Sequence, residues 1–161
     1  MERTMLAIFV LTVSSFSAEV FMGDEYAKAL CNAWNNTPTL VSELGKSESW
    51  TTVLERKIFL YREDCGSSKI IELIIKNEGE KAKCTYGGAA KDKRGKDDFL
   101  MYAETKRWLE MGRKEYGPMK AMIFGRLKFE GPKGVAMKNM GPFEAFLDII
   151  DEPQLDASKC P

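Results

Sequence analysis

Apolar and polar positions follow two different periods along this chain, and the change of period separates predicted helices from predicted strands. Residues 24–45 carry apolar side chains every three to four positions, the spacing of helices that bury one side. Pro38 suits the start of a second short helix and Gly45 suits its end, because proline has a helical φ and glycine often terminates helices. We therefore predict two helices over residues 24–45.

After Gly45 the apolar residues recur at every second position or on both alternations, which is typical of strands. We predict strands over residues 50–61, 70–75 and 81–86, with a hairpin turn at Asn77-Glu78-Gly79 between the last two. Short connections join antiparallel strands, whereas parallel strands need a long crossover. Residues 50–86 are therefore expected to form three consecutive antiparallel strands.

The second half of the chain alternates between the two periods. Residues 99–102 and 127–129 are the predicted fourth and fifth strands. Helices are expected to begin at Thr105, at Pro118 and at Gly141-Pro142, which are cap or first-turn residue types. Because strands and helices are grouped, the predicted class is α+β: a single domain with a five-stranded, mainly antiparallel sheet covered on one face by helices.

Composition narrows the class of function. The chain has 161 residues, of which 44% are hydrophobic and 30% charged, which fits one ordinary globular domain. Basic and acidic residues number 24 each, so no overall field attracts nucleic acid. The most basic stretch, residues 91–96, is followed at once by Asp97-Asp98, as in a solvated loop. Nucleic acid is not expected as a partner.

The chain contains no histidine, which excludes Ser-His-Asp and Cys-His nucleophilic pairs built from this chain alone. The four cysteines stand singly without C-x-x-C spacing, and no glycine-rich phosphate loop leads into a helix. We therefore expect neither catalysis nor a metal or other cofactor.

The cysteines also bear on the compartment. Cys31, Cys65, Cys84 and Cys160 can in principle form two disulfides, but a domain of this size does not need them. Reduced thiols in a cytoplasmic protein are the expected state. A secreted or periplasmic location would follow if residues 1–18 were a signal peptide.

Both ends of the chain differ from the domain between them. Residues 1–19 contain an apolar run of signal-peptide length after the single basic residue Arg3, too short to span a membrane as a helix. This segment is a cleaved signal, an upstream extension of a protein that starts at Met22, or an extra element packed on the domain. The last two interpretations together are favoured over the first. The polar tail, residues 152–161, is expected to be disordered.

Tryptophan, glycine and proline residues follow one another in a fixed order in the second half. The order is Trp108, Gly112, Pro118, Ala121 and then the run from Gly125 to Gly131. This order resembles the C-terminal half of the lipid-binding domain of the sterol carrier protein type 2 family, whose run reads Gly-Lys-apolar-Lys-apolar-x-Gly. Arg126 replaces the first lysine and keeps its charge. The resemblance extends over residues 20–151.

The resemblance implies an elongated apolar tunnel between sheet and helices. Such a tunnel would bind and carry fatty acids, fatty-acyl derivatives or sterol-like lipids without turning them over. Six of the nine methionines lie in the second half, and flexible thioethers repack readily around varied occupants. The ligand-binding residues that the resemblance implies are Phe99, Met101, Trp108, Met111, Met119, Met122, Ile123, Phe124, Phe129, Met137, Met140, Phe143, Phe146 and Leu147.

Helical spacing leads to one more specific expectation. Positions 119, 122 and 123 share one helical face, so we predict that they line the same apolar space as Phe143 and Leu147. Five basic residues nearby are predicted to be solvated helix positions in preference to contacts for a lipid head group. They are Lys106, Arg107, Arg113, Lys114 and Lys120.

Three hypotheses of function remain, and each makes a different structural demand. A lipid carrier calls for a continuous tunnel. An accessory module that presents a lipid to a partner enzyme calls for a filled core with an exposed apolar groove. A small enzyme calls for a buried ionisable group with a shifted pKa inside the cavity. Transient membrane contact is compatible with the first two, and the sequence does not specify an oligomeric state.

Overall fold

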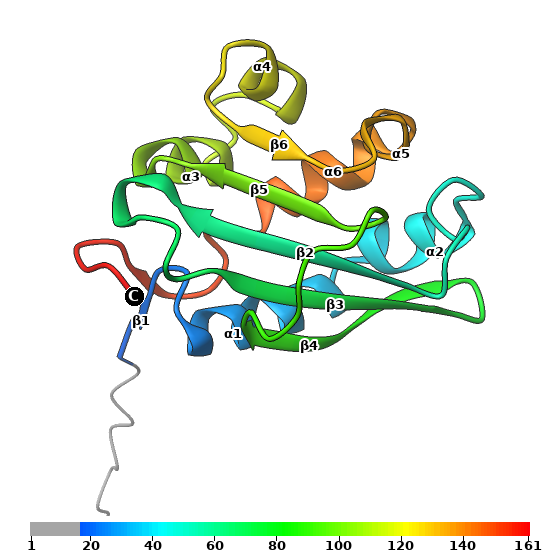
Figure 1. Cartoon of the computed structure of the whole chain (residues 1–161), viewed down its shortest axis with the longest axis horizontal. Helices are drawn as coiled ribbons and strands as arrows, with labels where there is room; N and C mark the ends of the chain where they lie inside the picture. The colour runs from blue at the N-terminus through cyan, green and yellow to red at the C-terminus, as the bar shows by residue number, and fades with distance from the viewer. Residues whose placement is uncertain (1–16) are drawn as a thin grey trace, which may run out of the picture.

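The computed structural model describes residues 17–161 and contains a five-stranded sheet (Figure 1). In chain order its strands are β2 (Glu55–Arg62), β3 (Ile71–Glu78), β4 (Lys81–Ala89), β5 (Phe99–Ala103) and β6 (Lys128–Glu130). They lie in the order β4-β3-β2-β5-β6. Neighbouring strands are antiparallel except β2 and β5, which are parallel.

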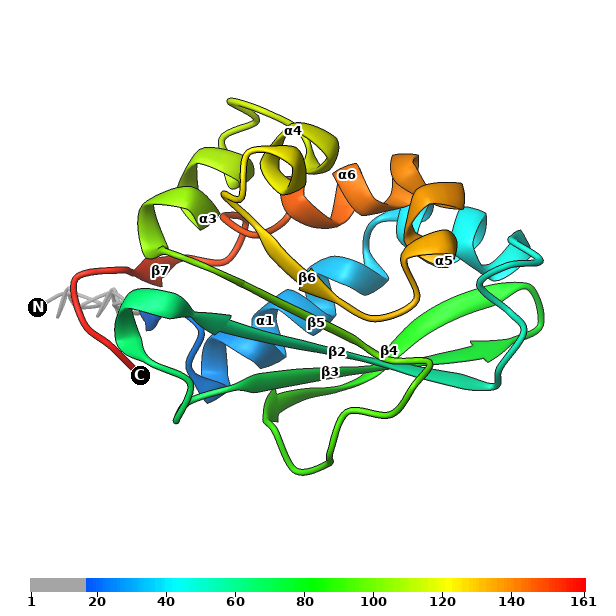
Figure 2. The same ribbon diagram turned by 45° about the horizontal axis from the view of Figure 1, so that its top comes forward.

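Helices cover one face of this sheet (Figure 2). They are α1 (Asp24–Asn35), the π-helix η1 (Thr39–Glu43), α2 (Leu44–Lys46), α3 (Thr105–Gly112), α4 (Pro118–Ile123), α5 (Lys133–Lys138) and α6 (Met140–Asp148), with a 3-10 turn η2 (Glu63–Cys65) after β2. Helix α1 packs closely on β4, since a Cβ atom on Gly87 would lie 2.2 Å from the carbonyl oxygen of Ala27. Only glycine allows the helix to approach the strand this closely.

The main core lies between the sheet and the helices. Alternate strand residues point into it, so that Ile58 is paired with both Leu73 and Phe99, and Leu60 with Met101. All five side chains are buried in one continuous cluster with the helices. The strand periodicity that the sequence shows therefore marks the inner face of the sheet.

The outer face of the sheet is partly covered by the loop of residues 90–98. The backbone N–H groups of Lys91 and Asp92 donate to Glu72 Oε2 at 2.9 and 3.3 Å, and Asp92 also pairs with Lys57 at 2.9 Å. Phe59 and Glu72 on this face are buried although they point away from the helices. The loop that the sequence predicts to be solvated thus also shields a carboxylate.

Most of the predicted architecture is confirmed. The class is α+β, residues 24–45 are helical in two segments, and β2, β3 and β4 are consecutive and antiparallel. Residues 50–54 are an exception, because they form a turn before β2. The buried guanidinium of Arg56 holds this turn, with Nε donating to the Trp50 carbonyl at 2.8 Å and Nη2 to that of Ser49 at 3.1 Å.

Thr105 is expected to cap its helix because threonine is a common N-cap residue, but its side chain does not do so. The N-cap of α3 is Glu104. The Thr105 hydroxyl donates to Asp64 Oδ1 at 2.8 Å and accepts from Arg62 Nε at 2.7 Å. Thr105 therefore ties the start of α3 to the end of β2.

The prediction of a disordered C-terminal tail is wrong. Strand β7 (Leu155–Asp156) pairs in parallel with β1 (Glu19–Val20). The buried Arg62 guanidinium donates to the carbonyl oxygens of Phe21 and Ala157 at 3.2 and 2.9 Å, and also to that of Lys159. A polar tail needs such fixed donors to become ordered, and its own composition does not reveal them.

The expectation of reduced thiols is also wrong, because the four cysteines form two disulfides. Cys31 and Cys84 join α1 to β4, and Cys65 and Cys160 join η2 to the C-terminal tail. The second bond closes a sequence separation of 95 residues and fixes the tail beside β2.

The interpretations of the apolar N-terminal run fall on residues 1–16, outside the described residues. Between residues 17 and 161, no helix has the length and apolar character needed to cross a bilayer.

Candidate functional site

An apolar space of about 40 Å³ lies between the inner face of the sheet and the helices, and we call it the enclosed space because residues of both layers line it. Its walls come from both halves of the chain. The lining residues are Trp34, Leu40, Leu44, Trp50, Ile58, Phe99, Met101, Phe129, Val135, Ala136, Asn139, Pro142, Phe143 and Phe146. A water molecule occupies about 30 Å³ in the liquid, so a space of this size holds no lipid chain without rearrangement.

Six of the fourteen lining residues are aromatic. The rings of Trp50 and Phe99 stack with centroids 5.8 Å apart, and Phe129 lies 5.6 Å from Phe99 and 5.8 Å from Phe143. Trp34 closes the other side, 5.9 Å from Phe146. Ring pairs at these distances stabilise the packing of the wall beyond the area that they bury.

Asn139 is the polar side chain of this lining. Its amide donates to Ser49 Oγ at 3.0 Å and to the Val135 carbonyl at 2.8 Å, so its hydrogen-bonding capacity is directed at the protein. No titratable group belongs to the lining among residues 17–161. The space can hold apolar matter, but its walls supply no proton donor or acceptor for chemistry at neutral pH.

Two open grooves lie on the surface beside this space. One of about 260 Å³ is lined by Met122, Ile123, Phe129, Lys133, Ala136 and Met137. The other, of about 320 Å³, lies along β6 and also includes Met122, Phe129 and Lys133. Phe129 lines the enclosed space and both grooves, and Ala136 lines the enclosed space and the smaller groove. These two residues therefore form the partition between interior and surface.

The segment that carries this partition folds for local reasons. Pro118 begins α4, and Gly125 follows the helix at φ +64°, the left-handed conformation that the sequence predicts for a helix stop. The Ala121 carbonyl accepts the N–H groups of Arg126 and Leu127, which turns the chain into β6. Strand β6 has three residues and pairs only with β5, so it is a short edge strand.

A polar network supports α4 from outside. Glu110 accepts from Tyr116 Oη at 2.6 Å and from Arg107 Nη1 at 2.9 Å, and these hydrogen bonds lower the pKa of Glu110. Burial, followed by the bond to Glu110, raises the pKa of Tyr116 to about 12. The Arg126 guanidinium lies over the rings of Tyr116 and Phe124, at 4.5 and 5.7 Å. These contacts fix the start and the end of α4.

The structure divides the predicted site residues into three groups. Phe99, Met101, Phe129, Phe143 and Phe146 line the enclosed space together. Met122, Ile123 and Met137 line the surface groove. The other six line neither this space nor these grooves: Trp108, Met111, Met119, Phe124, Met140 and Leu147.

The predicted common space for the α4 residues and α6 is wrong for Met119 and Ile123, whereas Met122 is partly buried and packs against the core cluster. Ile123 is 71% exposed and Met119 40% exposed, whereas Phe143 and Leu147 are buried. The buried face of α4 is instead Pro118 and Ala121. A helix of one and a half turns has few positions on each face, so spacing alone leaves its rotation undetermined.

The residues that sequence reasoning missed come from the first half of the chain. Trp34, Leu40, Leu44, Trp50 and Ile58 line the enclosed space. Their apolar character and period were visible, but only the fold places them opposite Phe99 and Phe143.

The nearby cations are mostly paired. Arg107 pairs with Glu110, Arg113 with Glu115 at 2.9 Å, and Lys114 with Asp148 at 3.3 Å; Lys106 lies 3.6 Å from Glu104. Lys106, Arg113 and Lys114 are exposed, as expected of ordinary solvated positions, whereas the Arg107–Glu110 pair is partly buried.

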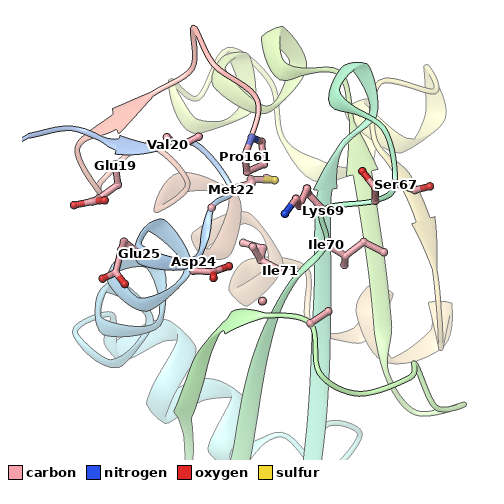
Figure 3. A pocket seen from close by; sticks show the side chains of 14 residues that line it. Glu19, Val20, Met22, Asp24, Glu25, Ser67, Lys69, Ile70, Ile71 and Pro161 are labelled. Carbon is pink, nitrogen blue, oxygen red and sulfur yellow. The ribbon is translucent and has the colours of Figure 1, made fainter.

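A larger, open pocket of about 730 Å³ lies at another end of the molecule, where β1 and the start of α1 meet the start of β3 and the C-terminal residue (Figure 3). Figure 3 shows Lys69 and Asp24 on opposite sides of this opening, and the lining also contains the buried residues Met22 and Ile71. Its rim carries Glu19, Asp24 and Glu25, so it is more polar than the space beneath α5 and α6. None of the residues predicted to bind ligand lines it.

A five-stranded sheet with helices on one face is a fold shared with solved structures. A crystal structure of sterol carrier protein 2 superposes with a TM-score of 0.54 at 16% identity and covers 82% of this chain and 98% of its own. A solution structure of a conserved hypothetical protein from Thermus thermophilus gives a TM-score of 0.50 at 17% identity, over 84% of this chain and 92% of its own. A comparison with curated protein sequences gives no match.

The family follows from the sequence. Residues 60–144, more than half of the chain, match the model of the SCP-2 sterol transfer family, and the chain belongs to this family. The resemblance that the residues from Trp108 to Gly131 indicated is thereby confirmed.

Proposed function

We propose that this protein binds long-chain apolar ligands, such as fatty acids, fatty-acyl derivatives or sterol-like lipids, in the space between the sheet and helices α5 and α6. The observation that carries the proposal is the apolar, aromatic-walled space that meets two surface grooves at Phe129. Membership of the SCP-2 sterol transfer family supports lipid as the ligand class.

Entry of a chain requires the enclosed space to widen. The segment from α4 to α5 is suited to this movement, because β6 pairs with one neighbour through three residues and Gly125 and Gly131 flank it at positive φ. Burial of a sixteen-carbon chain contributes about 13 kcal/mol at about 0.8 kcal/mol per methylene. Association costs of roughly 4–15 kcal/mol leave enough for micromolar binding or weaker.

A carrier role without catalysis fits the lining. The lining residues include no titratable group, and Asn139 uses its amide on the protein. Burial raises the pKa of Glu72, but this carboxylate lies on the outer face of the sheet, opposite the apolar space.

A specific observation also favours the second role, presentation of a lipid to a partner enzyme. The space between the layers measures only about 40 Å³, and the adjoining groove of about 260 Å³ is open. A filled core with an exposed apolar groove is the arrangement expected for such a module. Both roles share lipid binding and differ in the acceptor.

The disulfides favour a compartment other than the cytoplasm. Two cystines are typical of proteins that fold in oxidising surroundings, such as a periplasm or a secretory pathway. The cytoplasmic expectation rested on reduced thiols, so a secreted or periplasmic carrier is the better proposal.

Two alanines provide a matched test. Ala136 and Ala33 are equally buried, at 9% exposure, but only Ala136 lines the enclosed space and the groove. Ala136→Leu should weaken the binding of a pyrene-labelled fatty acid, whereas Ala33→Leu should not, and each should lose about 1–3 kcal/mol of stability from overpacking. Equal binding by both variants, or no saturable binding by the native chain, would contradict the proposed site. Native mass spectrometry of the purified protein and extraction of its lipid would identify the natural ligand.

A further inference from the structure

Exposed apolar side chains gather on one edge of the described structure. Five large hydrophobic residues are exposed, and four of them lie between residues 119 and 137: Met119, Ile123, Phe124 and Met137. Ile123 and Met137 line the same groove, so α4 and α5 present their apolar residues to a common opening. Figure 1 places these two helices at opposite ends of β6, along the edge of the sheet. We call this surface the α4–α5 edge; it is formed by the exposed residues of α4 and α5 and by Phe124, which directly follows α4.

Positive charge gathers on the same edge. Residues 118–138 contain five basic residues and one acidic residue, although the chain as a whole has 24 of each. Lys120, Lys133 and Lys138 are exposed on this surface. Phe124 lies beneath the Arg126 guanidinium at 5.7 Å, so a cation and an exposed ring are held together. Lys128 pairs with Glu63 from outside this segment, so the positive charge of the edge comes from these three exposed lysines, which make no ion pair among the described residues.

We propose that the α4–α5 edge docks on the surface of an anionic lipid membrane. Apolar side chains of this size enter the boundary between head groups and acyl chains, while lysines remain at the level of the phosphates. A second copy of the chain is a poor occupant, because a symmetric contact would place two such positive surfaces against each other. The inference rests on the proposed function. Docking would turn the surface groove lined by Phe129 toward the membrane, from which a lipid ligand would enter.

The test is flotation of the full chain with vesicles of phosphatidylcholine, with and without phosphatidylserine. The native chain should bind the vesicles that contain phosphatidylserine, and added salt should release it as the charges are screened. Replacing Lys120 and Lys138 by glutamine should lower partitioning about twenty-five-fold, at about fivefold for each lysine near an anionic surface. Phe124→Ser should lower it about tenfold through the lost insertion of one ring.

Matched controls lie elsewhere on the molecule. Lys93 and Lys96 are exposed in the loop over the outer face of the sheet, and Leu54 is 83% exposed. Replacing Lys93 and Lys96 by glutamine removes the same charge as the lysine variants above. Leu54→Ser removes an exposed apolar side chain, as Phe124→Ser does. Both controls should leave partitioning unchanged. Equal loss in the variants and controls, or equal binding to vesicles without phosphatidylserine, would overturn the proposal. A change in sedimentation mass caused by Phe124→Ser would overturn it in favour of an interface between copies.

Failure of the docking proposal is distinguishable from failure of the proposed function. Lys120, Lys138 and Phe124 line neither the enclosed space nor the grooves. Binding of a pyrene-labelled fatty acid in vesicle-free buffer therefore reports on the ligand site alone. A native chain that binds the fatty acid but does not float with anionic vesicles refutes docking and leaves the ligand site standing. Flotation without fatty-acid binding has the opposite meaning.

Discussion

The ring of Phe129 lies 5.8 Å from that of Phe143, and the two residues differ in position relative to the surface. Phe143 is buried and lines only the enclosed space, whereas Phe129 is half-buried and also lines both surface grooves. Phe129 belongs to a three-residue edge strand, so its ring can move with little loss of backbone pairing. We therefore expect access to the interior to depend on Phe129.

Phe129→Ala should join the enclosed space to the grooves and speed the uptake of a fatty acid. The loss of the ring should cost about 3 kcal/mol, the lower end for a phenylalanine, because Phe129 is only partly buried. Stopped-flow fluorescence with a pyrene-labelled fatty acid measures the rate. Phe59→Ala is the control, because Phe59 is buried on the outer face of the sheet and lines none of these spaces. Equal acceleration in both variants would indicate general loosening and not a gate.

Arg56→Lys should loosen the wall formed by Trp50. Arg56 donates to the Trp50, Asp97 and Ser49 carbonyls and to Thr52 Oγ1, and lysine cannot reproduce this planar set of bonds. We expect a loss of about 3 kcal/mol in urea unfolding, from carbonyls left without donors, and weaker fatty-acid binding. Arg94→Lys, at an exposed pair with Glu130, should change stability by about 0.5 kcal/mol or less. Unchanged stability of Arg56→Lys would show that the turn does not depend on the guanidinium.

Replacing Cys65 and Cys160 by serine should release the C-terminal tail. A loop of 95 residues is closed by this bond, and its loss should cost about 2–5 kcal/mol of stability. Hydrogen exchange should increase at Phe21, whose N–H donates to the Asp156 carbonyl. The pair Cys31→Ser and Cys84→Ser should instead affect α1 and β4. Unchanged exchange at Phe21 would mean that the Arg62 hydrogen bonds hold the tail by themselves.

The sequence predicts the sheet well because its strands carry period-two patterns over several residues. It predicts the end of α4 because Gly125 readily adopts the left-handed conformation that terminates helices. It fails where order depends on distant partners. The tail is ordered by Arg62 and Cys65, about 95 residues away, and nothing within residues 152–161 indicates these contacts. The turn over residues 50–54 likewise depends on the buried Arg56. A charged residue is normally predicted to be exposed, so the sequence pattern does not indicate this role.

The candidate site was only partly predictable for a similar reason. Apolar residues of the second half were recognisable as a set, but a short helix such as α4 gives too few positions to fix its rotation. Ile123 and Phe124 are therefore exposed although their types suggested burial. Trp50 reaches the site because it precedes β2, which the sheet order places beside β5, and Trp34 reaches it from α1, where its indole N–H donates to the Ala82 carbonyl of β4.

Glu72 should give the unfolding free energy a pH dependence of its own. Burial is the main cause that raises its pKa above the ordinary 4.5, and Oε1 has no hydrogen-bond partner. Between the ordinary and the raised value, the folded state binds the proton and the unfolded state does not. The contribution of Glu72 to stability is therefore fully present below pH 4.5 and is lost as the pH rises through the raised pKa.

Glu72→Gln should remove this dependence. Glutamine keeps an oxygen to accept the Lys91 and Asp92 N–H groups, and its amide can donate toward the acidic side of the loop. The difference in unfolding free energy between Glu72→Gln and the native chain, measured by urea unfolding at a series of pH values, should grow in favour of the variant as the pH rises. Glu55→Gln, at a more exposed position on the same face of the sheet, should show no such trend. A difference curve that is flat, or that falls with pH, would show that the buried carboxyl is not protonated preferentially in the folded state.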